Sequence, residues 1–415
     1  MRSLLIATTL FALLSVAVCA QDRYPIEDSR QKETILAARV REAHADEDRK
    51  RCVELGNEAI RDNRCYTTYP LATMIWGKGF YEGLAKITVR GKSGFINSKG
   101  VVVIKPDLRD AGHFSDGLAP FEDQNGKWGF IDSLGKVVIK PQFDLALSFR
   151  EGLAAVQIGT KWGFIGRDGE IKIEAKFETV SSFAEGLAEV TWFDESLATT
   201  DNPKGKRCSS FIDSHGNFKL EGRFDSISRN FDGGIALVNR SVPCPNNNCL
   251  ETYAIDKNGV RLWTLDSWYV SWIEDDAIVV AAGEDSDGHT LYCAIGRDGK
   301  RLFEERFSQI GGFSEGLAPA RKTWEGKYGF INKHGEFLIE DRFSSARSFS
   351  EGLAAVEVGS LYGYIDKNGN IVIPPQFEFA GQFQSGFALV APSGKGKDRT
   401  GYIDRNGKVI WQPTK

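Results

Sequence analysis

The sequence predicts an all-β repeat protein in which small antiparallel sheets follow one another along most of the 415-residue chain. Three observations carry this prediction. A glycine turn recurs at intervals of 34 to 47 residues from Gly100 to Gly407. A short aromatic strand precedes most of these turns. Glycine (44) and phenylalanine (27) are abundant and methionine (2) is rare, which suits turns and strands better than helical cores.

The stretch 126–143 shows one repeat in its most regular form. Trp128–Ile131 is aromatic and β-branched, as a short strand requires. Asp132 and Gly135 begin and end a tight turn, because an aspartate side chain bonds the backbone ahead and glycine accepts a positive φ. The strand that follows ends at Pro141, since proline cannot donate to a ladder. The repeat therefore contains a β-hairpin.

A second marker, Phe-x-Glu/Asp-Gly-Leu-Ala, precedes the hairpins. It begins at Phe80, Phe114, Phe149, Phe183, Phe313 and Phe349, with looser copies at Phe231 and Phe383. A whole unit then has three or four short antiparallel strands. The glycine of Trp-Gly leaves room on one sheet face, where we expect an aromatic ring of a neighbouring strand or unit. So small a sheet cannot bury both faces alone, so it must stack on its neighbours.

The clearest copies of the strand motif are Lys127–Asp132, Lys161–Ile165 and Lys327–Ile331. Together with the lead-in sequences, these copies resemble the bacterial WG-containing repeat family over residues 80–413. The resemblance implies an all-β repeat scaffold, often exported or surface-associated, without general catalytic residues. The fifth and sixth units depart from the pattern, since sequences beginning at Tyr253 and Tyr292 replace Trp-Gly-Phe-Ile.

Two architectures fit about nine such units: a propeller-like ring and an open β-solenoid. The ring is favoured because the last unit stops at Trp411–Pro413, without the segment that follows the proline elsewhere, and Tyr69–Met74 can supply an equivalent piece. A ring also hides sheet edges. The open array is supported by the number of units, which exceeds the usual four to eight blades, and by an N-terminal segment that can cap it.

Three regions are expected: a signal peptide at 1–20, a helical segment at 21–68 and the repeat domain at 69–415. The first has a basic residue, an apolar run and small residues before Gln21, which is typical of a cleaved secretory signal. We therefore expect a periplasmic or secreted protein without an integral membrane span once the signal is removed. A membrane anchor and a lipoprotein signal using Cys19 are the alternatives.

The segment 21–68 is charged and rich in helix formers, and Ile35, Leu36, Val40 and Ala43 recur at helical spacing. We expect one or two short helices there. They cap the β array or, alternatively, bind a partner.

Six cysteines remain after the signal, an even number that suits disulfides in an oxidising compartment. Sequence proximity favours Cys52 with Cys65 and Cys244 with Cys249, and elimination leaves Cys208 with Cys293. Buried free thiols are the alternative. No metal site is expected, because no Cys-x-x-Cys pair or neighbouring histidine completes a zinc ligand set.

Function is expected where the repeats are enlarged. Insertions between the first and second strands occur at 191–206, 239–251 and 283–289 in units four to six, and shorter ones occur at 321–326 and 393–399. Loops at one junction project from one face of a repeat array, where such proteins usually bind. The candidate binding residues are Trp192, Phe193, Asp194, Asp285, Asp287, His289 and Trp324. Loop aromatics of this kind stack on sugars or anchor protein partners.

The predicted function is that of a non-enzymatic exported scaffold that binds a protein through the loops of units four to six. A glycan or cell-wall binding module is the alternative. A polysaccharide hydrolase is less favoured, although a carboxylate pair can meet across a ring.

Several functions are not supported by the sequence. No catalytic residue or cofactor is expected, because the histidines are scattered and no metalloprotease, serine hydrolase or phosphate-loop motif occurs. The recurrent residues Asp132, Asp213, Asp256, Asp366 and Asp404 are expected to form turns. The net charge of −4 gives no electrostatic reason to expect nucleic acid or an anionic membrane as partner.

Overall fold

The computed structural model divides into two compact parts, Met1–Leu71 and Ala72–Lys415. It describes residues 79–198, 205–220, 223–244, 247–265, 270–393 and 400–412, all of which belong to the second part. The expected signal peptide, the helical segment and Tyr69–Met74 lie outside the described residues. Within these ranges no helix has the length and apolar character needed to cross a membrane.

The described residues form β-strands and one short 3-10 helix, arranged in repeat units that we number from one to nine. Unit one holds β1 (Phe80–Tyr81), β2 (Leu84–Val89), β3 (Lys92–Asn97) and β4 (Val102–Leu108). Unit two holds β5 (Asp110–Ala111), β6 (Leu118–Glu122), β7 (Trp128–Asp132) and β8 (Val137–Phe143). Unit three holds β9 (Leu145–Ala146), β10 (Leu153–Ile158), β11 (Lys161–Gly166) and β12 (Ile171–Phe177). Unit four holds β13 (Thr179–Val180), β14 (Ala188–Asp194), the 3-10 helix η2 (Glu195–Leu197) and β15 (Lys206–Ile212).

The remaining units follow the same order. Unit five holds β16 (Ser226–Asp232), β17 (Ile235–Cys244), β18 (Asn247–Asp256) and β19 (Arg261–Leu265). Unit six holds β20 (Val270–Glu274), β21 (Ala277–Glu284) and β22 (Thr290–Gly296). Unit seven holds β23 (Gln309–Ile310), β24 (Ala318–Arg321), β25 (Tyr328–Ile331) and β26 (Phe337–Phe343). Units eight and nine share β30 (Ile371–Ala380), with β27 (Ser345–Ala346), β28 (Ala354–Val358) and β29 (Leu361–Ile365) before it and β31 (Phe387–Pro392), β32 (Gly401–Asp404) and β33 (Val409–Trp411) after it.

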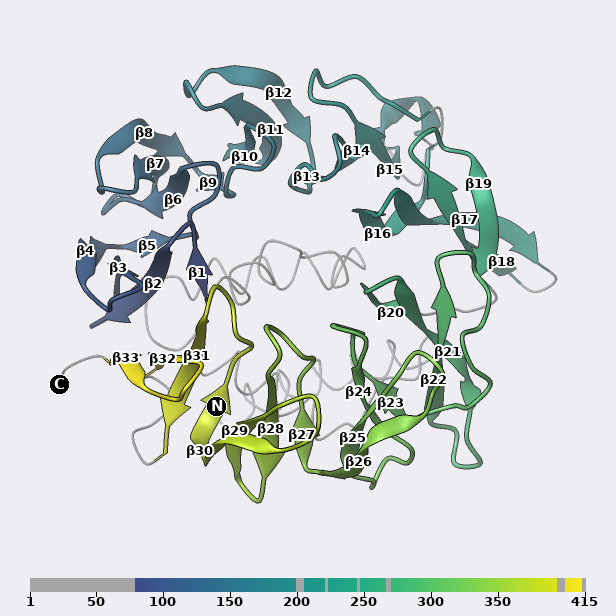
Figure 1. Cartoon of the computed structure of the whole chain (residues 1–415). Coiled ribbons are helices and arrows are strands. Elements are labelled where there is room, and N and C mark those ends of the chain that lie inside the picture. The colour runs from purple at the N-terminus through teal and green to yellow at the C-terminus, as the bar shows by residue number, and fades with distance from the viewer. Residues whose placement is uncertain are drawn as a thin grey trace, which may run out of the picture. The chain divides into compact units, whose positions relative to one another are not determined.

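Each unit is a small antiparallel sheet whose strands pair in sequence order. Units four and six have three named strands, and isolated bridges at Phe224 and Phe307 take the place of an outer strand. The strand β30 is unbroken, so units eight and nine form one seven-stranded sheet. The first strands of the units lie nearest the centre of the ring-like arrangement, and the last strands lie on its outer side (Figure 1).

The glycine of the Trp-Gly pair is required by a close backbone approach. A methyl group at Gly129 would lie 2.5 Å from the carbonyl oxygen of Ile139 and 2.7 Å from the nitrogen of Pro141. Gly163 and Gly363 meet the equivalent carbonyl oxygen at the same 2.5 Å. The outer strand bulges over this position, so its backbone fills the space. The expectation of an aromatic ring there was wrong for these three glycines, but at Gly329 the Phe337 ring of the neighbouring strand lies 2.7 Å from the methyl position.

Aromatic pairs join one unit to the next. The aromatic residue of the Trp-Gly-Phe strand meets the lead-in phenylalanine of the following unit, with ring centroids 4.7 to 4.9 Å apart. The pairs are Phe95 with Phe114, Phe130 with Phe149, Phe164 with Phe183, Phe211 with Phe231, Phe330 with Phe349 and Tyr364 with Phe383. Most are edge-to-face, which aromatic quadrupoles favour. The lead-in phenylalanine is therefore a contact between units.

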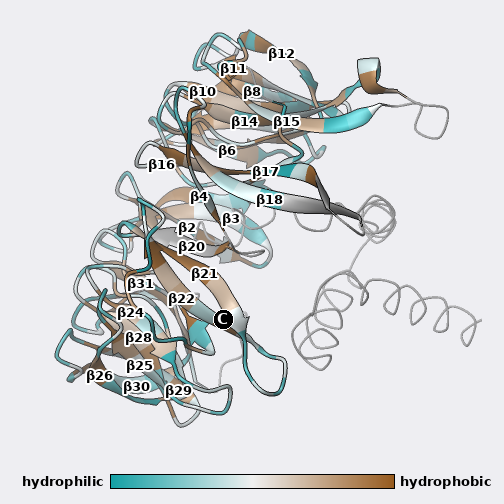
Figure 2. Cartoon of the chain, turned by 90° about the vertical axis from the view of Figure 1, so that its right-hand side faces the viewer, coloured by the Kyte–Doolittle hydropathy of each residue, from teal (hydrophilic) through white to brown (hydrophobic). Residues whose placement is uncertain are grey.

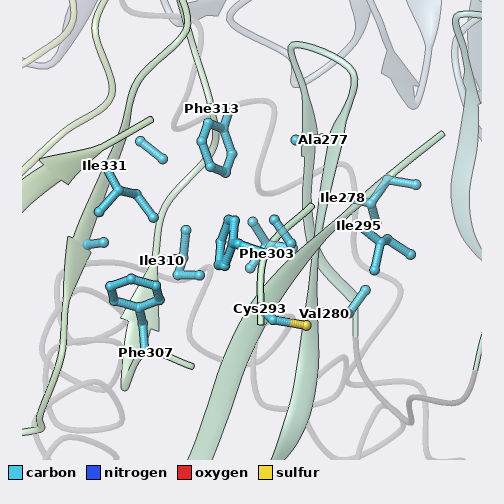
Figure 3. Packing of buried hydrophobic residues seen from close by; sticks show 14 of the residues in the cluster. Ala277, Ile278, Val280, Cys293, Ile295, Phe303, Phe307, Ile310, Phe313 and Ile331 are labelled. Atoms are coloured by element: carbon cyan, nitrogen blue, oxygen red, sulfur yellow. The ribbon is translucent and has the colours of Figure 1, made fainter. Parts of the chain in front are cut away.

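Units five and six lack this pair, because Ala254 and Ala294 occupy the aromatic position. A larger buried cluster joins units five, six and seven instead. Phe303 and Phe307 meet edge-to-face at 5.8 Å in this cluster. Figure 3 shows their rings packed with Ile310 and neighbouring aliphatic side chains. Phe307 stands where the regular units also end their outer strand with phenylalanine, whereas Phe303 replaces the isoleucine of those units and adds a ring to this cluster.

A belt of carboxylates also links neighbouring units. In seven units the residue before the lead-in glycine or its equivalent is acidic, has φ of 51° to 55° and accepts hydrogen bonds from a glycine amide of the next unit. The bonds run from Gly117 to Glu82, Gly152 to Asp116, Gly186 to Glu151, Gly316 to Asp275, Gly352 to Glu315 and Gly386 to Glu351, and Gly233 and Gly234 both bind Glu185. Left-handed backbone costs an acidic residue about 1 kcal/mol, and charge-assisted hydrogen bonds offset it.

The ring closes between units nine and one. Phe80 lies 4.3 Å from Phe387 and 5.3 Å from Tyr402, measured between ring centroids. Tyr402 Oη donates to the Lys86 carbonyl at 3.0 Å, and Ser385 Oγ donates to the Phe80 carbonyl at 3.2 Å. Together with a buried cluster shared by both ends, these contacts make a propeller-like ring (Figure 1). The all-β, propeller-like architecture is confirmed, and its closure depends on side-chain packing between the described strands.

Glu189 makes the stability of the ring depend on pH. It lies on β14 opposite Phe211, and burial raises its pKa from 4.5 to about 7 despite the neighbouring Arg207. The folded chain therefore binds more protons than the unfolded chain between these pH values, so stability falls as pH rises from 4.5 to about 7. We expect Glu189→Gln to raise the free energy of unfolding by about 2 kcal/mol at pH 8 and to change it little at pH 4.

Urea denaturation of Glu189→Gln at the two pH values measures this effect. Glu174→Gln, on the exposed side of β12, is the matched control and should behave as the parent chain at both. Equal gains for Glu189→Gln at pH 4 and pH 8 would contradict the assignment of the effect to a buried ionisation.

Candidate functional site

The enlarged hairpins bring the predicted binding residues into two groups. One group lies on the β14–β15 hairpin of unit four, and the other lies on the β21–β22 hairpin of unit six and the β24–β25 connection of unit seven. The hairpins β14–β15 and β17–β18 extend to the same side of the second part (Figure 2). This arrangement agrees with the expectation that the enlarged loops project from one face of the array. The candidate residues, however, lie in two separate groups.

The unit-four group is mainly structural. Trp192 is half-buried, packs against the core shared by units three and four, and meets the Phe218 ring at 4.8 Å. Asp194 is the N-cap of η2, where it accepts bonds from the Ser196 amide at 3.1 Å and the Ser196 hydroxyl at 2.6 Å. These bonds and an ion pair with Arg223 lower the pKa of Asp194. The side chains of Trp192 and Asp194 therefore stabilise the hairpin.

Phe193 differs from its neighbours on β14. Its side chain is half-buried, and its backbone lies opposite that of Arg207. Alternation along the strand places it on the other sheet face from Trp192. No partner ring is recorded for Phe193 within the described residues, so it is the member of the unit-four group that is least tied to the hairpin.

In unit six, Asp285, Asp287 and His289 lie together in one turn. Each offers a ligand atom, and these atoms lie within 4.8 Å of one another. Asp285 Oδ1 accepts from the amides of Asp287 and His289, both at 2.9 Å, and Asp285 Oδ2 is 3.2 Å from His289 Nδ1. The His289 amide is the largest cause of the lowered pKa of Asp285. The turn has the same form as the other Asp-x-x-Gly turns, so turn formation accounts for the closeness of these groups.

Trp324 of unit seven joins this turn. Its ring lies 5.3 Å from the His289 ring, and the Arg321 guanidinium lies 5.2 Å from both the Trp324 and Tyr328 rings. Arg321 Nη1 donates to the Trp324 carbonyl at 2.8 Å. Tyr328 Oη donates to Gln309 at 2.5 Å. We call His289, Arg321, Trp324 and Tyr328 the aromatic cluster.

The aromatic cluster can form a rigid contact surface. Arg321 is braced between two rings, and such cation–π contacts contribute about 0.5 to 2 kcal/mol each. All four side chains are only partly buried, or exposed in the case of His289, so parts of the rings face solvent. Trp324 Nε1 has no hydrogen-bond partner within the described residues. Because this nitrogen is itself buried, a partner can contact the exposed part of the indole ring but not its N–H donor.

Arg321 and Tyr328 were not among the predicted site residues. Tyr328 stands where the repeat usually has tryptophan, and Arg321 begins the inserted segment. A signal was therefore present, because two changes from the repeat pattern fall beside the predicted Trp324. The spatial link to unit six, through the contact between His289 and Trp324, could not be read from the spacing of the sequence.

The recurrent aspartates form turns, as predicted. One carboxylate oxygen of each accepts hydrogen bonds from the amides two and four residues ahead at 2.8 to 3.0 Å. This holds for Asp132, Asp213, Asp256, Asp366 and Asp404. Their side chains are thus explained by the fold.

The predicted disulfide between Cys208 and Cys293 was wrong. Both thiols are free and buried, Cys208 on β15 of unit four and Cys293 on β22 of unit six. They belong to different sheets with unit five between them in the chain, and burial raises the pKa of both thiols. Cys52 and Cys65 lie outside the described residues. The pairing of Cys244 with Cys249 stays a prediction, and the hairpin register places them opposite Asn247 and Val242.

Comparison with known proteins identifies the repeat. A family model described as "WG containing repeat" matches residues 94–128, 128–162, 162–191, 210–240, 328–362 and 362–391. No curated protein matches the sequence. The segments without a match are 1–93, 192–209, 241–327 and 392–415, and 241–327 includes the units that depart most from the pattern.

Several solved structures are similar to the chain at low identity. They are a eukaryotic initiation factor (11% identity, 80% of this chain and 85% of that chain, TM-score 0.40) and BamB from Moraxella catarrhalis (11%, 81% and 93%, 0.35). The WD40 β-propeller domain of Doa1 is a third (12%, 75% and 95%, 0.30).

Proposed function

Because the second part of the chain is built from WG-containing repeats, we propose that it is a non-enzymatic scaffold that binds a partner protein. A closed ring of small sheets offers a rigid support from which loops can present side chains. The aspartates that recur before the turn glycines are used in turns, so the repeated spacing of the sequence is explained by folding. Binding is therefore expected where the repeats differ from one another.

The aromatic cluster is the observation that carries this proposal. It combines tryptophan, tyrosine and arginine, the residue types that contribute most to protein interfaces. It also spans two neighbouring units, so a partner would contact the β21–β22 hairpin and the β24–β25 connection together. The proposed surface combines unit six, the last of the three units with predicted binding loops, with the shorter insertion of unit seven.

A glycan is the second candidate partner. The partly exposed indole of Trp324 lies beside the polar side chains of the Asp285–His289 turn. Sugars bind to proteins through such a combination of a stacking ring and neighbouring polar groups. The two candidates use the same residues, and they differ in the partner that is retained.

Trp324→Ala tests the proposal. Removing an interface anchor costs about 2 kcal/mol or more, so we expect at least a tenfold loss of a partner that the parent protein retains from an envelope extract of the source organism. Quantitative mass spectrometry of the retained proteins measures the loss. The thermal midpoint of the variant should stay near that of the parent, because the Trp324 side chain is only half-buried.

Phe218→Ala is the matched control, because Phe218 is an exposed aromatic residue of unit four outside the cluster. It should retain the partner. Equal retention by the parent and Trp324→Ala would contradict the site. Failure to retain any protein, together with binding to a glycan array that Trp324→Ala abolishes, would select the glycan.

We also propose that the protein is exported. The basic residue, apolar run and small residues of 1–20 support this proposal. Sequencing the N-terminus of the native protein tests the proposal, since cleavage after Ala20 would leave Gln21 as the first residue.

A further inference from the structure

The outer strands of units one and two leave aliphatic side chains in solvent. These strands, β4 and β8, are the last strands of their sheets and have no strand neighbour on the outer side among the described residues. A register shift in each strand inserts an extra residue, so consecutive valines both face outward. The exposed side chains and their exposed fractions are Val101 (57%), Val102 (44%), Val103 (37%), Leu134 (81%), Val137 (45%) and Val138 (47%).

Lysines flank these aliphatic residues. Lys99 and Lys105 belong to unit one, and Lys136 and Lys140 belong to unit two, and all four are exposed. None of the four forms an ion pair with a carboxylate within the part of the chain that the structure describes. Lys127, on the connection between β6 and β7, does form an ion pair, with Asp144 at 2.8 Å. The lysines on the outer strand of unit two therefore differ from another lysine of the same unit. The exposed carboxylate of Asp107 also lies on β4, and the four lysines still leave an excess of positive charge on this edge of a chain whose net charge is −4.

The two edges are close neighbours. The turn of unit two packs on the outer strand of unit one, since a methyl group at Gly135 would lie 3.3 Å from Cγ1 of Ile104. Leu134 and Lys136 flank this glycine, so the unit-two residues continue the unit-one surface. We call residues 99–108, which include β4, and residues 133–143, which include β8, the basic edge.

The outer strand of unit three also has an exposed aliphatic residue, but its lysine is paired with carboxylates. Ile171 on β12 is also exposed, at 47%. Its neighbour Lys172, however, lies 2.7 Å from Asp168 and 3.2 Å from Glu170. The fold therefore places similar aliphatic residues at equivalent positions, and the basic edge differs from unit three in its uncompensated charge.

We propose that the basic edge binds an extended, acidic segment of a partner protein by strand addition. An incoming strand bonds to the backbone groups of an unpaired sheet edge and covers the valines. Acidic side chains on the incoming strand would pair with the four lysines. A second copy of this chain is disfavoured, because pairing two such edges would bring lysines together.

A lipid bilayer fits the basic edge less well. Lysines and aliphatic residues also bind anionic membranes, but an unpaired strand edge has backbone groups that hydrocarbon cannot satisfy. The exposed aliphatic set contains no aromatic residue, whereas interfacial anchors commonly use tryptophan or tyrosine. Lysine and proline can protect a sheet edge from aggregation. Here, however, the consecutive valines remain exposed to solvent beside them.

Fluorescence anisotropy with a labelled peptide of four Glu-Val repeats tests the proposal. We expect saturable binding at low ionic strength that weakens as salt is added. The double variant Lys136→Glu/Lys140→Glu should bind at least tenfold more weakly, whereas Lys172→Glu, the matched change in unit three, should bind as the parent does. The same peptide with alternate backbone nitrogens methylated should also bind at least tenfold more weakly, because it cannot complete the ladder.

Several results would overturn the proposal. They are absence of peptide binding, equal binding by Lys136→Glu/Lys140→Glu with an unchanged thermal midpoint, and equal binding of the methylated peptide. Lysine-dependent binding to phosphatidylglycerol vesicles without peptide binding would assign the edge to a membrane. Trp324→Ala should bind the peptide normally, so this test and that of the aromatic cluster can fail independently.

Discussion

Gly129→Ala is expected to lower the free energy of unfolding by about 3 kcal/mol, because overpacking that the surroundings cannot relieve costs this much. The added methyl group would lie 2.5 Å from the Ile139 carbonyl oxygen and 2.7 Å from the Pro141 nitrogen. Both atoms belong to the backbone of the outer strand, which cannot move aside as a flexible side chain can. Relief therefore requires the strands β7 and β8 to separate locally.

Urea denaturation followed by circular dichroism measures the loss. Gly152→Ala is the matched control, since nothing lies within 4 Å of a methyl group there and only the positive φ of 81° is unfavourable. It should cost about 1 kcal/mol. An effect of Gly129→Ala no larger than that of Gly152→Ala would contradict the close approach, because Gly129 does not have a positive φ.

Phe80→Ala is expected to lower the free energy of unfolding by about 4 kcal/mol, as for other buried phenylalanines. Phe80 is 1% exposed and contacts Phe387 and Tyr402 across the seam between the last and first units. The cavity would remove the main aromatic contact that closes the ring. Few contacts would then hold the two ends together, among them the hydrogen bonds of Tyr402 and Ser385.

Phe149→Ala is the control for the seam. Phe149 is equally buried and pairs with Phe130 between consecutive units, so its loss should cost a similar free energy. The two variants should differ in cooperativity, because the seam joins residues more than 300 positions apart. Only Phe80→Ala should give a separate early transition in tryptophan fluorescence, reported by Trp411 beside the seam. A single transition identical to that of Phe149→Ala would contradict a weakened seam.

The candidate site was only partly predictable. Trp324 and His289 were identified from their place in enlarged connections, because departures from a repeat pattern can be seen in one sequence. Arg321 and Tyr328 were missed, since their importance comes from a contact between units six and seven. Trp192 and Asp194 were identified by the same reasoning, and the structure shows that they support their own hairpin.

The sequence by itself determined the strands, the turns and the repeat, because each depends on residues a few positions apart. Asp132 and Gly135 form their turn with their own backbone, as expected. Contacts between units were decided by the tertiary structure, since side chains 34 or more residues apart meet only when the sheets stack. These contacts include the belt of carboxylates, the aromatic pairs and the closing of the ring on Phe80. The tertiary structure also places the two buried thiols, which elimination had paired, in different sheets.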